Sequence, residues 1–120
     1  MRRVLIAEDD AELAAELGEA LRGEGCFVGT AGDGPRALER LRAEPWHVLL
    51  LDNKLPGLSG LELLARHREW FSAPAVFMIT GSLDIDDRLE HMGLGPLVAR
   101  VFTKPFDYQD LQRAVREAVG

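Results

Sequence analysis

Four apolar runs in the chain end at residues whose side chains could do chemistry. Each run is four or five residues long, and the polar residues follow it at once or one residue later. Residues 4–7 precede Glu8, Asp9 and Asp10, residues 48–51 precede Asp52, residues 75–79 precede Thr80 and Gly81, and residues 98–102 precede Lys104. The chain thus offers several carboxylates, a hydroxyl and an amine at similar places in successive segments.

Asp52 is the strongest indication of a site, because an acid that follows four aliphatic residues is costly to bury without a role. Carboxylates that converge from two segments repel each other unless a cation joins them. A hard divalent ion such as Mg²⁺ takes oxygen ligands and meets that need. With such an ion and Lys104 in place, Asp52 could attack a phosphoryl group and Thr80 could bond its oxygens.

Taken singly, most of these residues also have structural explanations. Asp9 or Asp10 could cap a helix, Thr80 could cap another, and Lys104 could be a solvated surface charge. Only the combination is specific, and it forms a site only if the fold brings these residues together.

The apolar runs have the length of strands, and the segments between them have the pattern of amphipathic helices. The predicted strands are residues 4–7, Phe27–Ala31, 48–51, 75–79 and 98–102. Ser59 and Glu62 form a capping-box pattern, which predicts a helix that runs to about Arg68. Residues 93–96 should end the fourth helix. Strand and helix alternate five times, which predicts an α/β fold: a doubly wound, five-stranded parallel sheet with helices on both faces. Ligands of such sheets bind beyond the carboxyl ends of the strands.

The length and composition are those of one globular domain, residues 1–120. A net charge of -6 argues against direct nucleic-acid binding, which depends on clustered basic residues. Cys26 is the single cysteine and cannot form an internal disulfide. Met1 to Arg3 are followed by only four apolar residues, too few for a signal peptide or a membrane span. We therefore expect a cytoplasmic protein without a membrane segment.

The residues resemble those of response-regulator receiver domains, the CheY-like domains of two-component signalling, from Arg3 to about Val119. The matching segments are residues 4–10, 32–38, 50–60, 78–81 and 102–106. The resemblance implies a flavodoxin-like sheet with strand order 2-1-3-4-5. It also implies phosphorelay signalling rather than turnover of a substrate, with catalysis limited to the domain's own aspartyl phosphorylation and dephosphorylation.

The same resemblance implies a metal site. Asp52 would be the phosphoacceptor and Asp9 the direct ligand of Mg²⁺, for which Mn²⁺ or Ca²⁺ could substitute in crystals. Glu8 would act through a metal-bound water, and Lys54 would lend its backbone carbonyl. Asp10 would have a structural role.

Three further residues would contact the phosphoryl group, namely Thr80, Gly81 and Lys104, with a backbone amide near Asn53 completing the cradle. The resemblance also implies a cis peptide bond between Lys104 and Pro105.

The implied phosphoryl donor is a sensor histidine kinase or a histidine phosphotransfer protein. The output would be a downstream protein or an output domain, and the sequence leaves open whether one follows Gly120. A homodimer through the fourth helix, the fifth strand and the fifth helix is the arrangement that the resemblance suggests first.

Two positions depart from the family's usual pattern. Val101 stands where an aromatic residue is common, and the alternation of a strand should turn the neighbouring Phe102 to the opposite face, into the core. Lys54 lies two residues after Asp52. Our hypothesis is that its side chain contacts the phosphoryl group or a pocket carboxylate and changes the lifetime of the phosphorylated state.

Three other functions are weighed against this one. A phosphorylation-independent receiver would act only as an interaction module, but it usually lacks an acid, the threonine or the lysine. A haloacid-dehalogenase-type phosphatase needs an acid where this chain has Lys54. A flavin binder needs a first loop that accepts phosphate, which Glu8 and Asp9 would repel.

The positions of the histidines and of the large aromatic residues indicate structural roles. His47, His67 and His91 lack metal-ligand spacing. Trp46, Trp70 and Phe71 are expected to anchor helices to the sheet, although a partner surface at residues 70–71 is left open.

Overall fold

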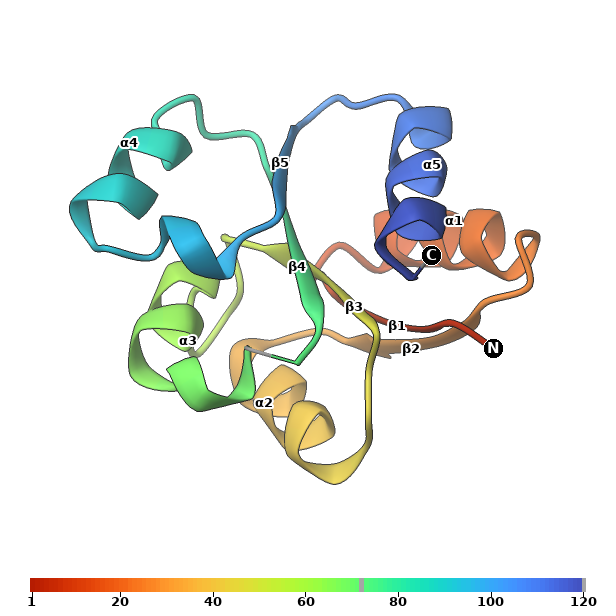
Figure 1. The fold of residues 1–120 in the computed structure, drawn as a ribbon, viewed down its shortest axis with the longest axis horizontal. Helices are drawn as coiled ribbons and strands as arrows, with labels where there is room; N and C mark the ends of the chain where they lie inside the picture. Colours follow the sequence, from red (N-terminus) through yellow and green to blue (C-terminus); the bar gives the residue numbers. More distant parts are fainter. Residues whose placement is uncertain (72, 120) are drawn as a thin grey trace.

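The computed structural model describes residues 1–71 and 73–119, and Gly120, the last residue of the expected domain, lies outside them. Within these residues strands and helices alternate along the chain (Figure 1). The strands are β1 (Arg3–Ala7), β2 (Phe27–Ala31), β3 (Val48–Asp52), β4 (Ala75–Thr80) and β5 (Arg100–Thr103). The helices are α1 (Ala11–Arg22), α2 (Gly34–Ala43), α3 (Gly60–Arg66), α4 (Ile85–His91) and α5 (Tyr108–Val119), with short 3-10 turns at Arg68–Trp70 and Gly95–Leu97.

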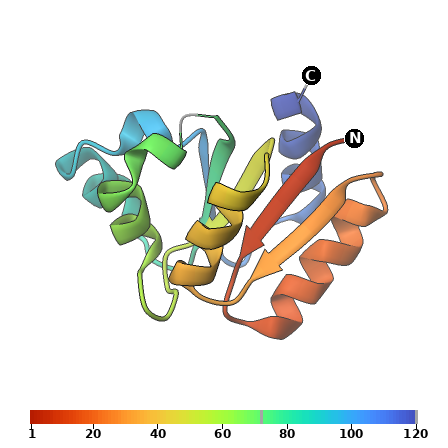
Figure 2. The same cartoon turned by 90° about the horizontal axis from the view of Figure 1, so that it is seen from below.

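All five strands form one parallel sheet in the order β2-β1-β3-β4-β5, which confirms the predicted order. Helices α1 and α5 cover one face, and α2, α3 and α4 cover the other (Figures 1 and 2). Each face has its own apolar core, built from alternate residues of the same strands. The central strands are therefore buried on both sides, which is why residues 48–51 are apolar without alternation and fully buried.

The helices that flank the site begin where the sequence places capping residues. The Asp10 carboxylate accepts the N–H groups of Glu12 and Leu13, both at 3.1 Å, and starts α1. Ser59 and Glu62 form the predicted capping box at the start of α3. Such caps satisfy N–H groups that the first turn of a helix leaves free. They fix where α1 begins after β1 and where α3 begins after β3.

Two predicted boundaries miss by two residues, whereas the other predicted strand ends lie within one residue of those in the structure. The fifth strand begins at Arg100, not Val98, because the Val98 N–H still closes the preceding 3-10 turn by donating to the Gly95 carbonyl at 3.1 Å. The third helix ends at Arg66, not Arg68, because His67 leaves the helical conformation (φ -131°, ψ 43°). The chain then continues as the turn Arg68–Trp70.

The aromatic residues divide between core and surface. Trp46 and Phe71 are buried, as expected for residues that anchor helices. Trp70 is 37% exposed, and the Arg42 guanidinium lies 5.7 Å from the centre of its ring, so the expectation of an anchor was wrong there. Among the described residues, no helix combines the length and the apolar character needed to cross a bilayer.

Candidate functional site

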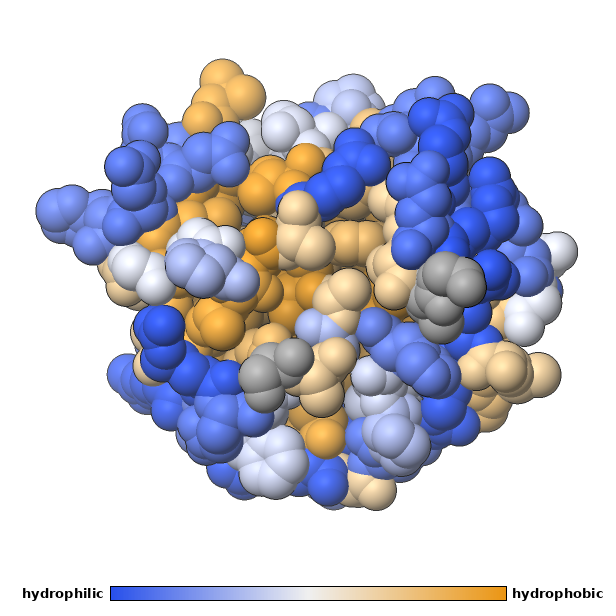
Figure 3. Space-filling view, viewed as in Figure 1, coloured by the Kyte–Doolittle hydropathy of each residue, from blue (hydrophilic) through white to orange (hydrophobic). Residues whose placement is uncertain are grey.

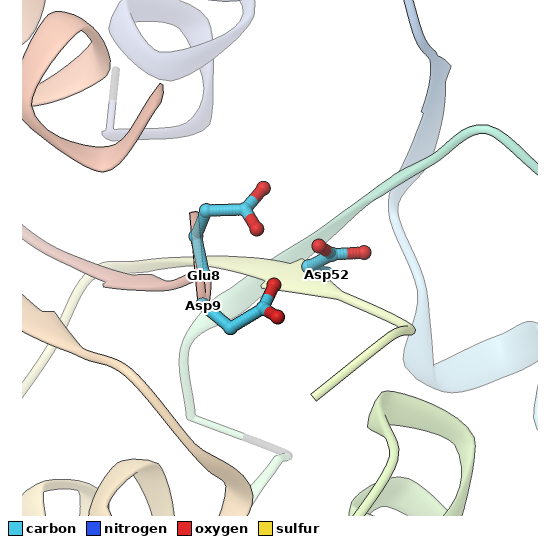
Figure 4. Close-up of side chains that lie close together, drawn as sticks. All are labelled: Glu8, Asp9 and Asp52. Carbon is cyan, nitrogen blue, oxygen red and sulfur yellow. The ribbon is translucent and has the colours of Figure 1, made fainter. Parts of the chain in front are cut away.

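Three carboxylates meet at the carboxyl ends of β1 and β3 (Figure 4). Ala7 pairs with Leu51 in the sheet, so Glu8 and Asp52 follow at the same level of adjacent parallel strands. Glu8, Asp9 and Asp52 each offer an oxygen within 4.8 Å of the others. The side chains of Glu8 and Asp52 are 1% and 5% exposed, whereas Asp9 is exposed. The cluster therefore has a buried floor and an open side.

Lys104 brings the positive charge of this pocket from the end of β5. Its ammonium donates to Glu8 Oε1 at 2.8 Å and to Asp52 Oδ2 at 3.2 Å. The backbone N–H of Lys104 donates to the Thr80 carbonyl at 2.7 Å, which holds this part of the chain beside β4. One ammonium faces three carboxylates, so the pocket carries an excess of negative charge when all are ionised.

The crowding of these charges changes two pKa values. Burial, and then the hydrogen bond shared with Asp52, raise the pKa of Glu8 from 4.5 to about 7, although the Lys104 ammonium works against the shift. Burial alone would lower the pKa of Lys104, but its bonds to Glu8 and Asp52 outweigh burial and raise it. Lys104 is thus held in its charged form, and Glu8 keeps its proton to a higher pH than an ordinary glutamate does.

The loop after Asp52 is tied to the start of α3. Asp52 Oδ1 accepts the Lys54 N–H at 3.1 Å, and the buried Asn53 side chain accepts the Leu61 N–H at 3.0 Å. A Cβ on Gly60 would lie 2.8 Å from the Asp52 carbonyl oxygen, so only glycine lets α3 approach this closely. From the sequence only a backbone amide near Asn53 was expected at the site, and this role of the Asn53 side chain was not foreseen.

Thr80 ends β4, the strand next to β3. Asp52 pairs with Ile79, so Thr80 extends one residue beyond the acid. Its side chain is buried, and Oγ1 accepts the Ser82 N–H at 3.0 Å. The neighbouring Gly81 is exposed. The structure therefore places a buried hydroxyl, followed by an exposed glycine, at the end of the strand next to Asp52.

The remaining predicted positions divide between the pocket and the two cores. The Asp10 N–H donates to Glu8 Oε2 at 3.2 Å, and the Lys104–Pro105 bond is cis, as the resemblance implied. Val101 packs with the core under α4, whereas Phe102 is buried on the opposite face. The Lys54 side chain is exposed, and among the described residues it forms no ion pair with a pocket acid.

The donor set of the pocket fits a hard divalent cation. Carboxylate oxygens are the ligands that Mg²⁺ and Ca²⁺ prefer, and a cation would relieve the repulsion that one ammonium only partly offsets. The described residues of the cluster include no histidine or cysteine, which would favour zinc.

The sequence matches a known family over most of its length. The profile of the response regulator receiver domain matches residues 4–116. The chain is 34% identical over 117 residues to the response regulator receiver protein CpdR of Brucella abortus, covering 98% of this chain and 96% of CpdR. It is also 34% identical to the transcriptional regulatory protein CutR of Streptomyces coelicolor, covering 95% of this chain but 52% of CutR. The chain thus spans nearly all of one relative and about half of the other.

Solved structures agree on the fold. A CheY-like receiver domain protein of Methanospirillum hungatei superposes with a TM-score of 0.85 at 27% identity, over 98% of this chain and 92% of that one. The response regulator TrrA of Thermotoga maritima, solved in complex with Mg²⁺ and BeF, has a TM-score of 0.86 at 24% identity, over 98% and 99% of the two chains. With the profile match and the curated relatives, these likenesses show that the chain belongs to the response regulator receiver domain family of two-component systems.

Proposed function

We propose that residues 1–120 form a phosphorylation-competent receiver domain, in which Asp52 accepts a phosphoryl group from a phosphohistidine. The observation that carries the proposal is the double hydrogen bond of Lys104 to Glu8 and Asp52, which places a fixed positive charge against the acceptor carboxylate. A dianionic group can approach a buried acid only where such charge offsets the repulsion.

The transfer would use the residues of this chain in distinct roles. An oxygen of Asp52 attacks the phosphorus, an O–P bond forms, the P–N bond breaks, and its electron pair returns to the imidazole ring. Lys104 then pairs with a phosphoryl oxygen. The Thr80 hydroxyl and the Gly81 N–H donate to the others. Hydrolysis by an in-line water releases inorganic phosphate and restores the carboxylate.

Receiver domains use Mg²⁺, and this pocket has the groups to hold it. We assign Asp9, Asp52 and the Lys54 backbone carbonyl as ligands and Glu8 as an acid that acts through a bound water. Mn²⁺ or Ca²⁺ could substitute, because both also take oxygen ligands. When bound, the ion supplies the further positive charge that phosphoryl oxygens require.

Receiver domains are signalling modules, and response regulators act with histidine kinases. For this chain the donor would be a cytoplasmic histidine kinase domain or a histidine phosphotransfer protein, and the domain itself would bind neither nucleic acid nor membrane. The face of α4, β5 and α5 is the surface we assign to a downstream protein, an output domain or a second copy. Figure 3 shows apolar side chains in the hollow between the hydrophilic surfaces of α4 and α5. A cavity of about 390 Å³ lies between α4 and β5, where Leu89, Val98 and Val101 line it together with the charged residues Asp86, Glu90 and Arg100.

Intact mass after incubation with acetyl phosphate and Mg²⁺ tests this proposal. The parent should gain one phosphoryl group, and the gain should be lost in Asp52→Ala or when EDTA removes the metal. Asp86→Ala, which removes an exposed acid of α4, is the matched control and should be modified like the parent. Modification that persists in Asp52→Ala, or none in the parent, would contradict the proposal and favour a receiver that acts without phosphorylation.

A further inference from the structure

Two successive hydrogen bonds connect the buried Thr80 hydroxyl to the surface. Thr80 Oγ1 accepts the Ser82 N–H at 3.0 Å, and Ser82 Oγ donates to Asp84 Oδ1 at 2.5 Å. The Thr80 side chain is 1% exposed, Ser82 is half-buried and Asp84 is exposed. The position of the hydroxyl in the pocket is therefore linked to a carboxylate outside it.

Asp84 stands directly before α4, where an aspartate usually caps a helix. Its backbone carbonyl accepts the Arg88 N–H at 3.0 Å, but its side chain accepts no N–H of the first turn. In contrast, Asp10 and Asp33 do cap α1 and α2 in this way. An aspartate in this position usually stabilises a helix by accepting these N–H groups. The bond to Ser82 thus takes the place of a cap that α4 lacks.

The missing cap matters because α4 is short and weakly anchored. It has seven residues, of which Ile85 and Leu89 are buried. A helix of two turns depends strongly on its first hydrogen bonds, because there are few others. A change in what the Asp84 carboxylate binds would therefore alter the stability of α4 and the surface beside Val101.

We propose that Asp84 acts through Ser82 as a positioning residue for the Thr80 hydroxyl. The inference rests on the proposed phosphorylation of Asp52 and concerns its regulation. With Asp52 unmodified, Asp84 holds Ser82, and the Ser82 N–H holds Thr80 Oγ1. When a phosphoryl group draws the Thr80 hydroxyl toward its own oxygens, Ser82 is released and Asp84 turns to cap α4. This coupling from Thr80 to α4 needs no aromatic side chain at position 101, where this chain has a valine.

The resting and the phosphorylated arrangements depend on different contacts of the Asp84 side chain. The Ser82–Asp84 bond stabilises only the resting arrangement, so its removal should favour the phosphorylated one. The Asp84 cap stabilises only the phosphorylated arrangement. A variant that loses both the Ser82–Asp84 bond and the cap should therefore gain little affinity for a phosphoryl mimic. A ligand or variant shifts such an equilibrium only by its different free energy in the two states.

Titration with beryllofluoride, a phosphoryl mimic, at saturating Mg²⁺ tests the proposal. Ser82→Ala should bind about two- to fivefold more tightly than the parent, the effect of losing one exposed hydrogen bond of the resting state. Ser82→Thr keeps the hydroxyl and should restore parental affinity, whereas Asp84→Ala should bind no more tightly than the parent. Glu90→Gln, elsewhere on α4, controls for the loss of a negative charge and should match the parent.

Amide shifts give a second readout that a general loss of stability would not produce. In the parent, beryllofluoride should move the N–H signals of Asp86 and Asp87 downfield as they gain a carboxylate acceptor, and Asp84→Ala should abolish this shift. Equal or weaker binding by Ser82→Ala, or unmoved amide signals in the parent, would overturn the inference while leaving phosphorylation of Asp52 intact. A parent that binds no beryllofluoride would overturn the proposed function and this inference with it.

Discussion

Lys104 lies closer to Glu8 than to Asp52: its ammonium is 2.8 Å from Glu8 Oε1 and 3.2 Å from Asp52 Oδ2. The acid that we assign to an indirect metal role is thus the stronger partner of the lysine. This arrangement leaves the acceptor carboxylate with a longer contact. We infer that Glu8 serves to position the ammonium as well as to balance charge.

Lys104→Gln should weaken beryllofluoride binding about tenfold or more, because a hydrogen bond to a charged group contributes about 1.5–3 kcal/mol. The glutamine keeps a polar side chain, one atom shorter than lysine, and removes its charge. Isothermal titration at fixed Mg²⁺ measures the effect. Arg113→Gln on α5, which removes an exposed cation away from the pocket, is the control. Unchanged affinity in Lys104→Gln would rule out a direct contact with the phosphoryl mimic.

Without Mg²⁺, the protein should lose stability as the pH rises from about 5 to 7. Burial and the bond with Asp52 raise the pKa of Glu8 to about 7 in the folded state, against an ordinary value of 4.5. Between these values the folded state holds a proton that the unfolded state has released, so raising the pH favours unfolding. Relative to Glu8→Gln, which cannot titrate, the parent should lose about 2 kcal/mol over this range, at about 1.4 kcal/mol per unit of pKa shift.

Urea unfolding in EDTA at several pH values measures this difference. Above about pH 8 the two curves should run parallel, because Glu8 is then ionised in both the folded and the unfolded parent. A difference that stays constant from pH 5 to 7 would contradict the raised pKa.

The sheet was predictable because its strands are buried on both faces. The strands of residues 48–51 and 75–79 could be read as apolar runs, and strand order followed from the resemblance. The start of β5 was not predictable, because Val98 is apolar whether it pairs in the sheet or closes the turn of Gly95–Leu97. An apolar side chain indicates that a residue is buried, but it does not show which group its backbone N–H binds.

The charged residues of the site were predictable for a similar reason: parallel strands end at one edge, so Glu8, Asp52 and Lys104 were expected at the same edge of the sheet. The neutral polar contacts were not. Asn53 reaches the Leu61 N–H, and Ser82 reaches Asp84, through loop conformations that leave no periodic pattern in the sequence. Asparagine and serine are common in loops whether or not they make such contacts.

Lys54→Ala should dephosphorylate about two- to fivefold faster than the parent if the exposed ammonium pairs with the phosphoryl group, the range expected of one exposed ion pair. The resting structure leaves the Lys54 side chain exposed, which is consistent with a partner that arrives only with phosphorylation. Decay of the phosphorylated mass after removal of acetyl phosphate gives the rate. Arg42→Ala, an exposed cation of α2, is the control. Equal rates for Lys54→Ala and the parent would remove the hypothesis.

Gly60→Ala should destabilise the protein by about 1–3 kcal/mol, the usual cost of forcing extra atoms into a packed region. The added Cβ would lie 2.8 Å from the Asp52 carbonyl oxygen and 3.0 Å from Asn53 Cα, so α3 or the acceptor strand must shift. Gly95→Ala meets open space and should change stability by less than about 0.5 kcal/mol. Because α3 is held against the residue that we assign as phosphoacceptor, Gly60→Ala should also slow the mass gain with acetyl phosphate. Parental stability and parental phosphorylation in Gly60→Ala would show that this close approach does not position Asp52.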